Sequence, residues 1–180
     1  MAITISGGAT ISGGATIGSG GSPSPSPGGG GFQGSNFGYN AGGQSPASVN
    51  TIDKFSFSSD SNATDVGDLT SAKNGLAGQS SSTSGYGSGG YNPGYHDAIE
   101  KWPFSSDSNA SDVGDITVAR WFGSGQSSST SGYTSGGGFP NSNVIDKFPF
   151  ASDGNATDVG DMTTSNYGTA GQSSSENGYV

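Results

Sequence analysis

Short alternations of apolar and polar residues recur along the chain and predict β-strands. Residues 54–57 and 147–150 carry a Phe at every second position, the pattern of a strand with one buried face. Residues 65–70 predict a second short strand, and residues 80–88 predict a third and leave room for a fourth. Apolar residues at helical spacing are not apparent, and so much Gly and Ser disfavours helix. The pattern therefore predicts an all-β fold.

Two local features constrain these strands. Pro103 and Pro149 stand between aromatic residues and lack an N–H, so their strands are expected at a sheet edge or with the proline where no donor is needed. Residues 60–65 are dense in Asp, Asn and Ser, so we expect the chain to reverse there.

A sequence repeat of about 47 residues occurs three times, with its copies aligned at Ile52, Ile99 and Ile145. Sixteen positions after each Ile stands an Asp, and 26 positions after it begins Gly-Gln-Ser-Ser-Ser, followed by a closing Gly-Tyr. The length varies only in the Gly-rich stretch after that Tyr. A fixed interior with a variable link is typical of one supersecondary unit joined by a surface loop.

Three segments follow from this pattern. Residues 1–21 carry a six-residue Ile/Thr/Gly repeat, which suits a solenoid-like coil, a strand added to a partner's sheet, or a flexible tail. Residues 22–31, rich in Ser, Pro and Gly, are expected to be a linker. Residues 32–180 form the predicted β-repeat domain.

Composition excludes several classes of protein. The net charge of −9 with only five Lys and Arg argues against nucleic-acid binding. The absence of Cys excludes disulfides and thiolate metal sites, and no apolar run is long enough to span a bilayer. The first five residues have neither a basic nor an apolar region, so we expect no secretion signal. With 28% hydrophobic residues, the chain is expected to bury enough surface only with partners.

Residues 32–180 resemble repeats of the kelch type, which form β-propeller blades. The shared features are a double glycine, a variable loop, an aromatic strand and a Leu/Ile-Thr-x-x-Lys/Arg segment at residues 69–73 and 116–120. The family's Tyr-to-Trp spacing is not reproduced, and Asn166 stands where the third basic residue belongs. The resemblance implies four-stranded blades of about 50 residues, and three blades are too few for a propeller. The chain begins and ends inside the repeat, so we expect homo-oligomerisation to complete the fold.

The amino-acid sequence of the repeats is similar to that of repeats in virion-associated proteins of tailed phages infecting marine bacteria. Residues 145–161 and the Ala-Gly-Gln-Ser-Ser-Ser string carry this resemblance. It implies a virion protein, either a tail fibre, an appendage or a capsid decoration, whose partners are itself, other virion proteins and a host-surface glycan. The alternatives are a lectin-like carbohydrate-binding module, an extracellular fibre-forming protein, and a hydrolase of surface polysaccharide.

An acidic set recurs in each repeat and fits two interpretations. Its carboxylate and amide oxygens suit Ca²⁺, although the ligand order of an EF-hand is missing. Alternatively, the residues form Asx turns that bond the local backbone. The set comprises Asp60, Asn62, Asp65, Asp68, Asp107, Asn109, Asp112, Asp115, Asp153, Asn155, Asp158 and Asp161.

Catalytic chemistry has little support. His96 is the only histidine and lies in a loop, which weakens any Ser-His-Asp arrangement. The acids recur in every unit, whereas a catalytic pair would be expected once. We therefore expect no enzyme and no cofactor other than the Ca²⁺ just considered.

The aromatic residues fit a thin core or a surface that stacks on sugar rings. For the Tyr and Phe series we favour the core, since small strands need large apolar side chains. Trp121 and Phe122 have no aromatic counterpart pair in the other repeats, so we expect them to form an exposed contact.

Overall fold

The computed structural model describes residues 36–174 and 176–180, and this part of the chain is all-β. The expected segments 1–21 and 22–31 lie outside the described residues, as do the first four residues of the repeat domain. Among the described residues there is no helix long and apolar enough to cross a bilayer.

Thirteen short strands make up the described fold. They are β1 (Phe37–Ala41), β2 (Thr51–Ser56), β3 (Thr64–Asp68), β4 (Ala77–Ser80), β5 (Ser84–Ser88), β6 (Ala98–Pro103), β7 (Ser111–Asp115), β8 (Ser124–Ser127), β9 (Ser131–Ser135), β10 (Val144–Pro149), β11 (Thr157–Asp161), β12 (Gln172–Ser173) and β13 (Gly178–Tyr179).

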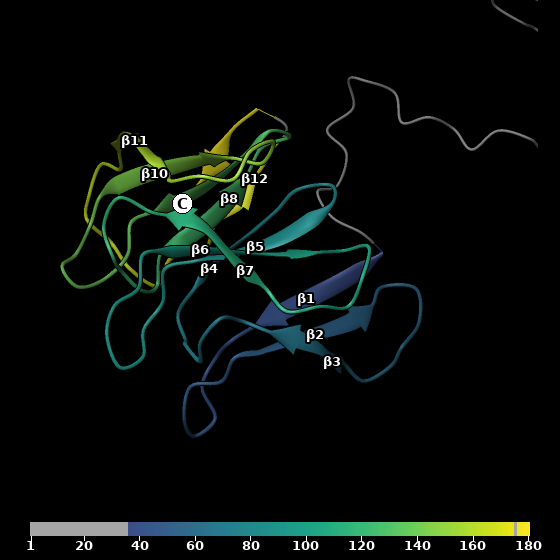
Figure 1. The fold of residues 1–180 in the computed structure, drawn as a ribbon. Coiled ribbons are helices and arrows are strands. Elements are labelled where there is room, and N and C mark those ends of the chain that lie inside the picture. The colour runs from purple at the N-terminus through teal and green to yellow at the C-terminus, as the bar shows by residue number, and fades with distance from the viewer. Residues whose placement is uncertain (1–35, 175) are drawn as a thin grey trace, which may run out of the picture.

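The strands form antiparallel sheets that follow one another along the chain (Figure 1). Two sheets have four strands, in the orders β4-β5-β6-β7 and β11-β10-β9-β8. The strands β1, β2 and β3 correspond to β5, β6 and β7 of the complete sheet, and the strands β12 and β13 correspond to β4 and β5. In Figure 1 the sheet β4–β7 lies between the sheet β1–β3 and the sheet β8–β11.

Each four-stranded sheet starts with a strand that packs on the corresponding strand of the next sheet. A side chain at Gly125 would collide with the carbonyl of Gly78, and one at Gly171 would collide with the carbonyl of Gly125. Glycine is therefore required for this close approach. Serine hydroxyls bridge the same strands: Oγ of Ser127 accepts the N–H of Ser80 at 2.9 Å. The recurring Gly-Gln-Ser string thus encodes a contact between strands of different sheets.

The core lies between sheets and is built on aromatic side chains of β6 and β10. Trp102 is 6% exposed and Phe148 is 2% exposed. Each ring covers the glycine opposite it on the neighbouring strand, Gly85 or Gly132, where a Cβ would collide with the ring. This explains why Gly precedes Tyr in the repeat.

The expected strands are present, with small shifts of their ends. Residues 54–57 fall in and just after β2, residues 65–70 overlap β3, and residues 80–88 form the end of β4 together with β5. Pro103 is the last residue of β6, a strand inside its sheet, and lies beyond the last pair of β6 with β7 at Lys101. Of the two positions expected for this proline, the one that needs no donor is observed.

The aromatic series is only partly buried. Tyr86 lies in the core at 3% exposure, whereas Tyr179 is 57% exposed. Phe55 and Phe57 are 40% and 57% exposed, so the expectation that the Phe series forms core fails in the first repeat. The reason is that their counterparts pack on the preceding sheet of this chain, and β1–β3 is the first sheet in the described residues.

Two fully buried ion pairs join successive sheets. Nζ of Lys73 lies 3.3 Å from Oε1 of Glu100, and Nη2 of Arg120 lies 2.7 Å from Oδ2 of Asp146. The basic residue comes from the segment after one sheet, and the acid comes from the third strand of the next sheet. All four side chains are at most 1% exposed.

A β-bulge precedes each buried acid. The register shifts between Ile99 and Glu100, and again between Ile145 and Asp146. A bulge turns the next side chain away from the regular alternation, which places these acids in the interior beside the cation.

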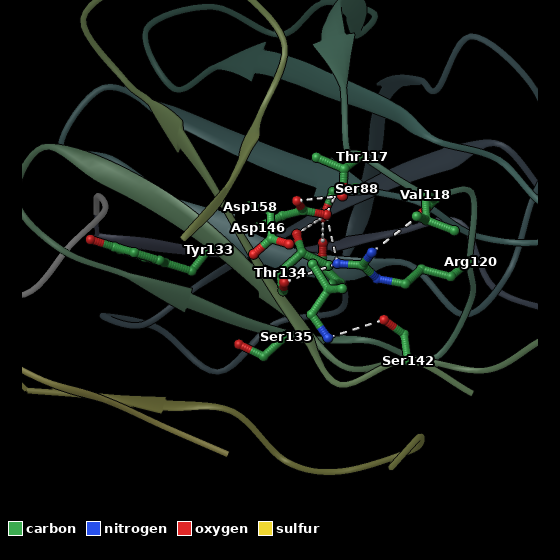
Figure 2. A network of polar contacts seen from close by, with 12 residues as sticks. Ser88, Thr117, Val118, Arg120, Tyr133, Thr134, Ser135, Ser142, Asp146 and Asp158 are labelled. Carbon is green, nitrogen blue, oxygen red and sulfur yellow. Dashed lines mark hydrogen bonds and ion pairs between the residues drawn. The ribbon is translucent and has the colours of Figure 1, made fainter. Parts of the chain in front are cut away.

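A threonine three positions before each cation completes the pair. Thr117 donates its hydroxyl to Oδ1 of Asp146 at 2.8 Å and its N–H to Oδ2 at 3.2 Å. Arg120 also donates to the carbonyl of Thr134 at 3.1 Å, and Figure 2 shows the guanidinium between these acceptors. In the preceding junction Thr70 donates both its N–H and its hydroxyl to one oxygen of the acid, Oε1 of Glu100. The Thr-x-x-Lys/Arg segment therefore clamps a buried acid, since both its threonine and its cation bind the carboxylate.

Replacing the buried cation should destabilise the protein strongly. Arg120→Met leaves Asp146 buried without its counter-charge, so we expect a loss of about 3–5 kcal/mol in the free energy of unfolding, measured by urea titration. Asn166→Met introduces the same side chain at the corresponding exposed position and should change stability by less than about 0.5 kcal/mol. A loss below about 1 kcal/mol for Arg120→Met would contradict a stabilising role for the pair.

Candidate functional site

The acidic residues at the start of β3, β7 and β11 form Asx turns. Oδ1 of Asp65 accepts the N–H of Gly67 at 3.2 Å, and Asp112 and Asp158 accept the corresponding glycine N–H groups at 3.1 and 3.0 Å. These bonds are local, as an Asx turn requires.

The asparagines of the set bond across the gap between sheets. Oδ1 of Asn109 accepts the N–H of Asp68 at 3.0 Å, and Oδ1 of Asn155 accepts the N–H of Asp115 at 3.1 Å. The outer ends of neighbouring sheets are therefore joined by an amide side chain.

Exposed ion pairs lie beside these asparagines. Nζ of Lys54 lies 2.5 Å from Asp107, and Nζ of Lys101 lies 2.8 Å from Asp153. The hydrogen bond to Asp107 raises the pKa of Lys54, and the hydrogen bond to Asp153 raises that of Lys101. Burial raises the pKa of Asp115, helped by the charges of Asp97 and Asp112.

The acidic set does not converge on a metal site in the described structure. Residues 36–174 and 176–180 contain no group of three or more His, Asp or Glu side chains placed to hold a metal ion. Most of the predicted ligands instead accept backbone N–H groups or pair with lysine, and Ca²⁺ binding stays a prediction. The sequence residues concerned are Asp60, Asn62, Asp65, Asp68, Asp107, Asn109, Asp112, Asp115, Asp153, Asn155, Asp158 and Asp161.

Five aromatic side chains from three different loops gather into one cluster, which we call the loop aromatic cluster. The ring centroids of Tyr95 and Phe139 lie 5.6 Å apart with their planes 20° apart, and those of Trp121 and Phe122 lie 4.3 Å apart. Tyr91 lies 5.3 Å from Trp121 and links the two pairs. These residues come from the β5–β6, β7–β8 and β9–β10 connections.

Much of this cluster is open to solvent. Phe139 is 68% exposed, Phe122 is 40% exposed and Tyr95 is 37% exposed. The expectation of an exposed Phe122 therefore agrees with the structure, while Trp121 is half-buried among its neighbours. Grouped aromatic exposure of this kind is a mark of a contact surface.

Phe122 is held in a backbone conformation that favours glycine. Its φ is 51°, and the corresponding residues of the other repeats are Gly75 and Gly168, both at φ 67°. Its N–H donates to Gly75 O at 2.7 Å, and its carbonyl accepts the N–H of Gly168 at 2.8 Å. A left-handed non-glycine residue costs about 1–3 kcal/mol, so an aromatic residue at this position lowers the stability of the fold.

The sequence analysis identified two members of the cluster and missed three. Tyr91, Tyr95 and Phe139 lie in the variable Gly-rich links, where comparison of repeats gave no common position. The available signal was the presence of aromatic residues in two links that consist mostly of Gly, Pro, Ser and Asn.

His96 follows Tyr95 of the cluster and stabilises the β5–β6 connection through hydrogen bonds. Its Nε2 lies 3.1 Å from the carbonyl oxygen of Asn92, and its backbone carbonyl accepts the N–H of Arg120 at 3.1 Å. These contacts give the histidine a structural task in the loop.

No protein-family model matches the chain, and a search of curated proteins returns no match. The kelch-like and phage-virion resemblances therefore stay expectations.

Calcium should leave thermal stability unchanged if the Asx-turn interpretation is right. We expect equal melting temperatures in excess Ca²⁺ and in EDTA, because the carboxylates already serve local bonds. Asn109→Ala should lower the melting temperature in both buffers, since it removes the acceptor for the Asp68 N–H. A rise in melting temperature that depends on Ca²⁺ would instead support the metal interpretation.

Alkaline pH should reveal the Lys101–Asp153 pair. The folded pKa of Lys101 lies above its usual 10.5, so its contribution is fully present below pH 10.5 and is lost as pH rises through the folded value. The difference in melting temperature between the wild type and Lys101→Met should therefore be largest near pH 8 and shrink above pH 10.5. A difference that is constant over this range would contradict the pair's contribution.

Proposed function

We propose that this chain is a non-enzymatic structural and adhesive component of a phage virion, of the tail-fibre, appendage or capsid-decoration kind. Its blade-like repeats of the kelch type carry the loop aromatic cluster outward, and the cluster contacts a host-surface glycan. The fold is completed by homo-oligomerisation, and other virion proteins are its further partners.

The loop aromatic cluster carries this proposal. Aromatic faces pack on the apolar C–H faces of sugar rings, and Tyr and Trp keep a polar group for hydrogen bonding. Backbone hydrogen bonds hold these loops, as between the N–H of Phe122 and the carbonyl of Gly75, and the rings are already together, so less conformational entropy is lost on binding. Phe122 occupies a position that costs stability, which is expected where a side chain serves binding rather than packing.

The repeated acids favour a structural role over catalysis. They accept hydrogen bonds within turns and from a threonine of the neighbouring repeat, and they form ion pairs. Each of these roles recurs from sheet to sheet. This use matches a scaffold whose sheets must stack in register.

A second candidate is a free lectin-like module. The same aromatic cluster favours it, and it differs from the leading proposal only in where the protein resides. Antibody detection of the chain on purified phage particles separates the two: presence on particles supports the virion component, and glycan binding without particle association supports the lectin.

Phe122→Gly should separate binding from stability. Because Gly occupies the corresponding positions 75 and 168, we expect the melting temperature to be retained or raised. Binding to an arrayed bacterial surface glycan should fall about tenfold, since one stacking surface is lost.

Val180→Ala is the matched control, because it also removes an exposed apolar side chain but lies outside the loop aromatic cluster. Its glycan binding should equal that of the wild type. Equal binding by Phe122→Gly and the wild type would refute the adhesive role of the cluster.

A further inference from the structure

The two internal junctions between sheets are built from the same contacts. Across the first, between the sheets β1–β3 and β4–β7, Lys54 pairs with Asp107 and the carbonyl of Asp68 accepts the N–H of Ala110 at 2.8 Å. Across the second, between the sheets β4–β7 and β8–β11, Lys101 pairs with Asp153 and the carbonyl of Asp115 accepts the N–H of Ala156 at 2.7 Å. The same set of contacts between sheets therefore occurs twice within the chain.

In each internal junction the earlier sheet supplies the lysine, and the outer face of the sheet β8–β11 has the same residues as that lysine-bearing face. Lys147 corresponds to Lys54 and Lys101, and it is exposed with its amino group 5.9 Å above the Tyr133 ring. Val159 is 51% exposed, whereas the corresponding Val66 and Val113 are half-buried in the two junctions. A Cβ at Gly160 would meet no atom within 4 Å, although Gly67 and Gly114 are covered by the next sheet.

In each internal junction the later sheet supplies the aspartate, and the outer face of the sheet β1–β3 has the same residues as that aspartate-bearing face. Asp60 corresponds to Asp107 and Asp153, and it is exposed. Phe55 is 40% exposed, whereas its counterparts Trp102 and Phe148 are 6% and 2% exposed in the junctions. One face thus offers a lysine and an exposed valine, and the other offers an aspartate and an exposed aromatic.

We propose that these two faces bind each other between copies of this chain, head to tail. Gly178 and Tyr179 of β13 correspond to Gly38 and Tyr39 of β1, so β1 of the next copy takes the place of the hairpin β12–β13 beside the sheet β8–β11. Lys147 of one copy pairs with Asp60 of the next, and Phe55 packs on Val159 and Tyr133. The outer end of β11 then receives Asn62 and Ala63 of the next copy, as β3 and β7 receive their counterparts within the chain. The two faces differ, so the interface is heterologous and yields a closed ring or an open filament.

One element of the internal junctions is absent from the junction between copies. Asn166 stands where Lys73 and Arg120 supply the buried cation, and Asp53 stands where Glu100 and Asp146 supply the acid. Without the buried ion pair, the junction between copies is weaker than the internal ones and responds to protein concentration. Thr163 keeps the hydroxyl that binds the acid in each clamp.

This inference rests on the proposed structural role and names its partner, a second copy of the chain. Its failure is distinguishable from failure of that role. Loss of assembly in charge variants is read from molar mass, whereas adhesion is read from glycan binding by the loop aromatic cluster.

The test is a charge exchange on the full chain, with molar mass measured by light scattering over a range of concentrations. The wild type should associate. Lys147→Glu and Asp60→Lys should each weaken association about fivefold to tenfold, because each places like charges opposite one another. The double variant should restore association, since its opposite charges are exchanged rather than removed.

Asp97→Lys is the control for Asp60→Lys, because it makes the same change in net charge at an exposed acid outside both faces. Its association should equal that of the wild type. A monomeric wild type at every concentration, single variants that associate normally, or a double variant that fails to recover would each overturn the proposal.

Asn166→Arg tests the interior of the same junction. Supplying the missing cation opposite Asp53 should tighten association at least about tenfold, as buried charge pairs do at protein interfaces. Unchanged or weaker association would show that Asn166 does not face Asp53 of another copy.

Discussion

A buried acid clamped by the preceding repeat is the interaction on which the arrangement of the sheets depends. Glu100 and Asp146 have no exposed surface, so each carboxylate needs a cation and further hydrogen bonds. Lys73 and Arg120 supply the charge, and the threonine three positions earlier supplies two donors. Because cation and acid come from different sheets, the pair forms only when the sheets are in register.

The apolar contacts alone would fix the register poorly. The sheets are rich in Gly and Ser. The buried hydrophobic residues of the described structure form two small clusters, one with Trp102 and one with Phe148, each lying between two sheets. Small side chains allow the first strands to approach closely at Gly78 and Gly125, but they give little directional preference. The buried polar network shown in Figure 2 adds that direction, since an acid displaced from its donors would lose its compensation.

The sequence predicted the strands and the repeat unit but not how repeats meet. Alternating aromatics identified β2 and β10, and the recurring Asp, Gly-Gln-Ser and Gly-Tyr positions marked the repeat. The Thr-x-x-Lys/Arg segment was visible, yet its partner acid lies 26 or 27 residues later in sequence, a separation that periodicity does not reveal. Only Trp121 and Phe122 of the loop aromatic cluster were predicted, because the other three members lie in links of variable length.

Amide hydrogen exchange of Thr70 and Thr117 tests the central claim most directly. Both N–H groups donate to the buried acids although both residues are exposed in loops between strands. If the clamp holds the sheets together, these amides should exchange as slowly as those of the central strands β5 and β9. Exchange as fast as that of exposed loop amides would show that the sheets are held together without it.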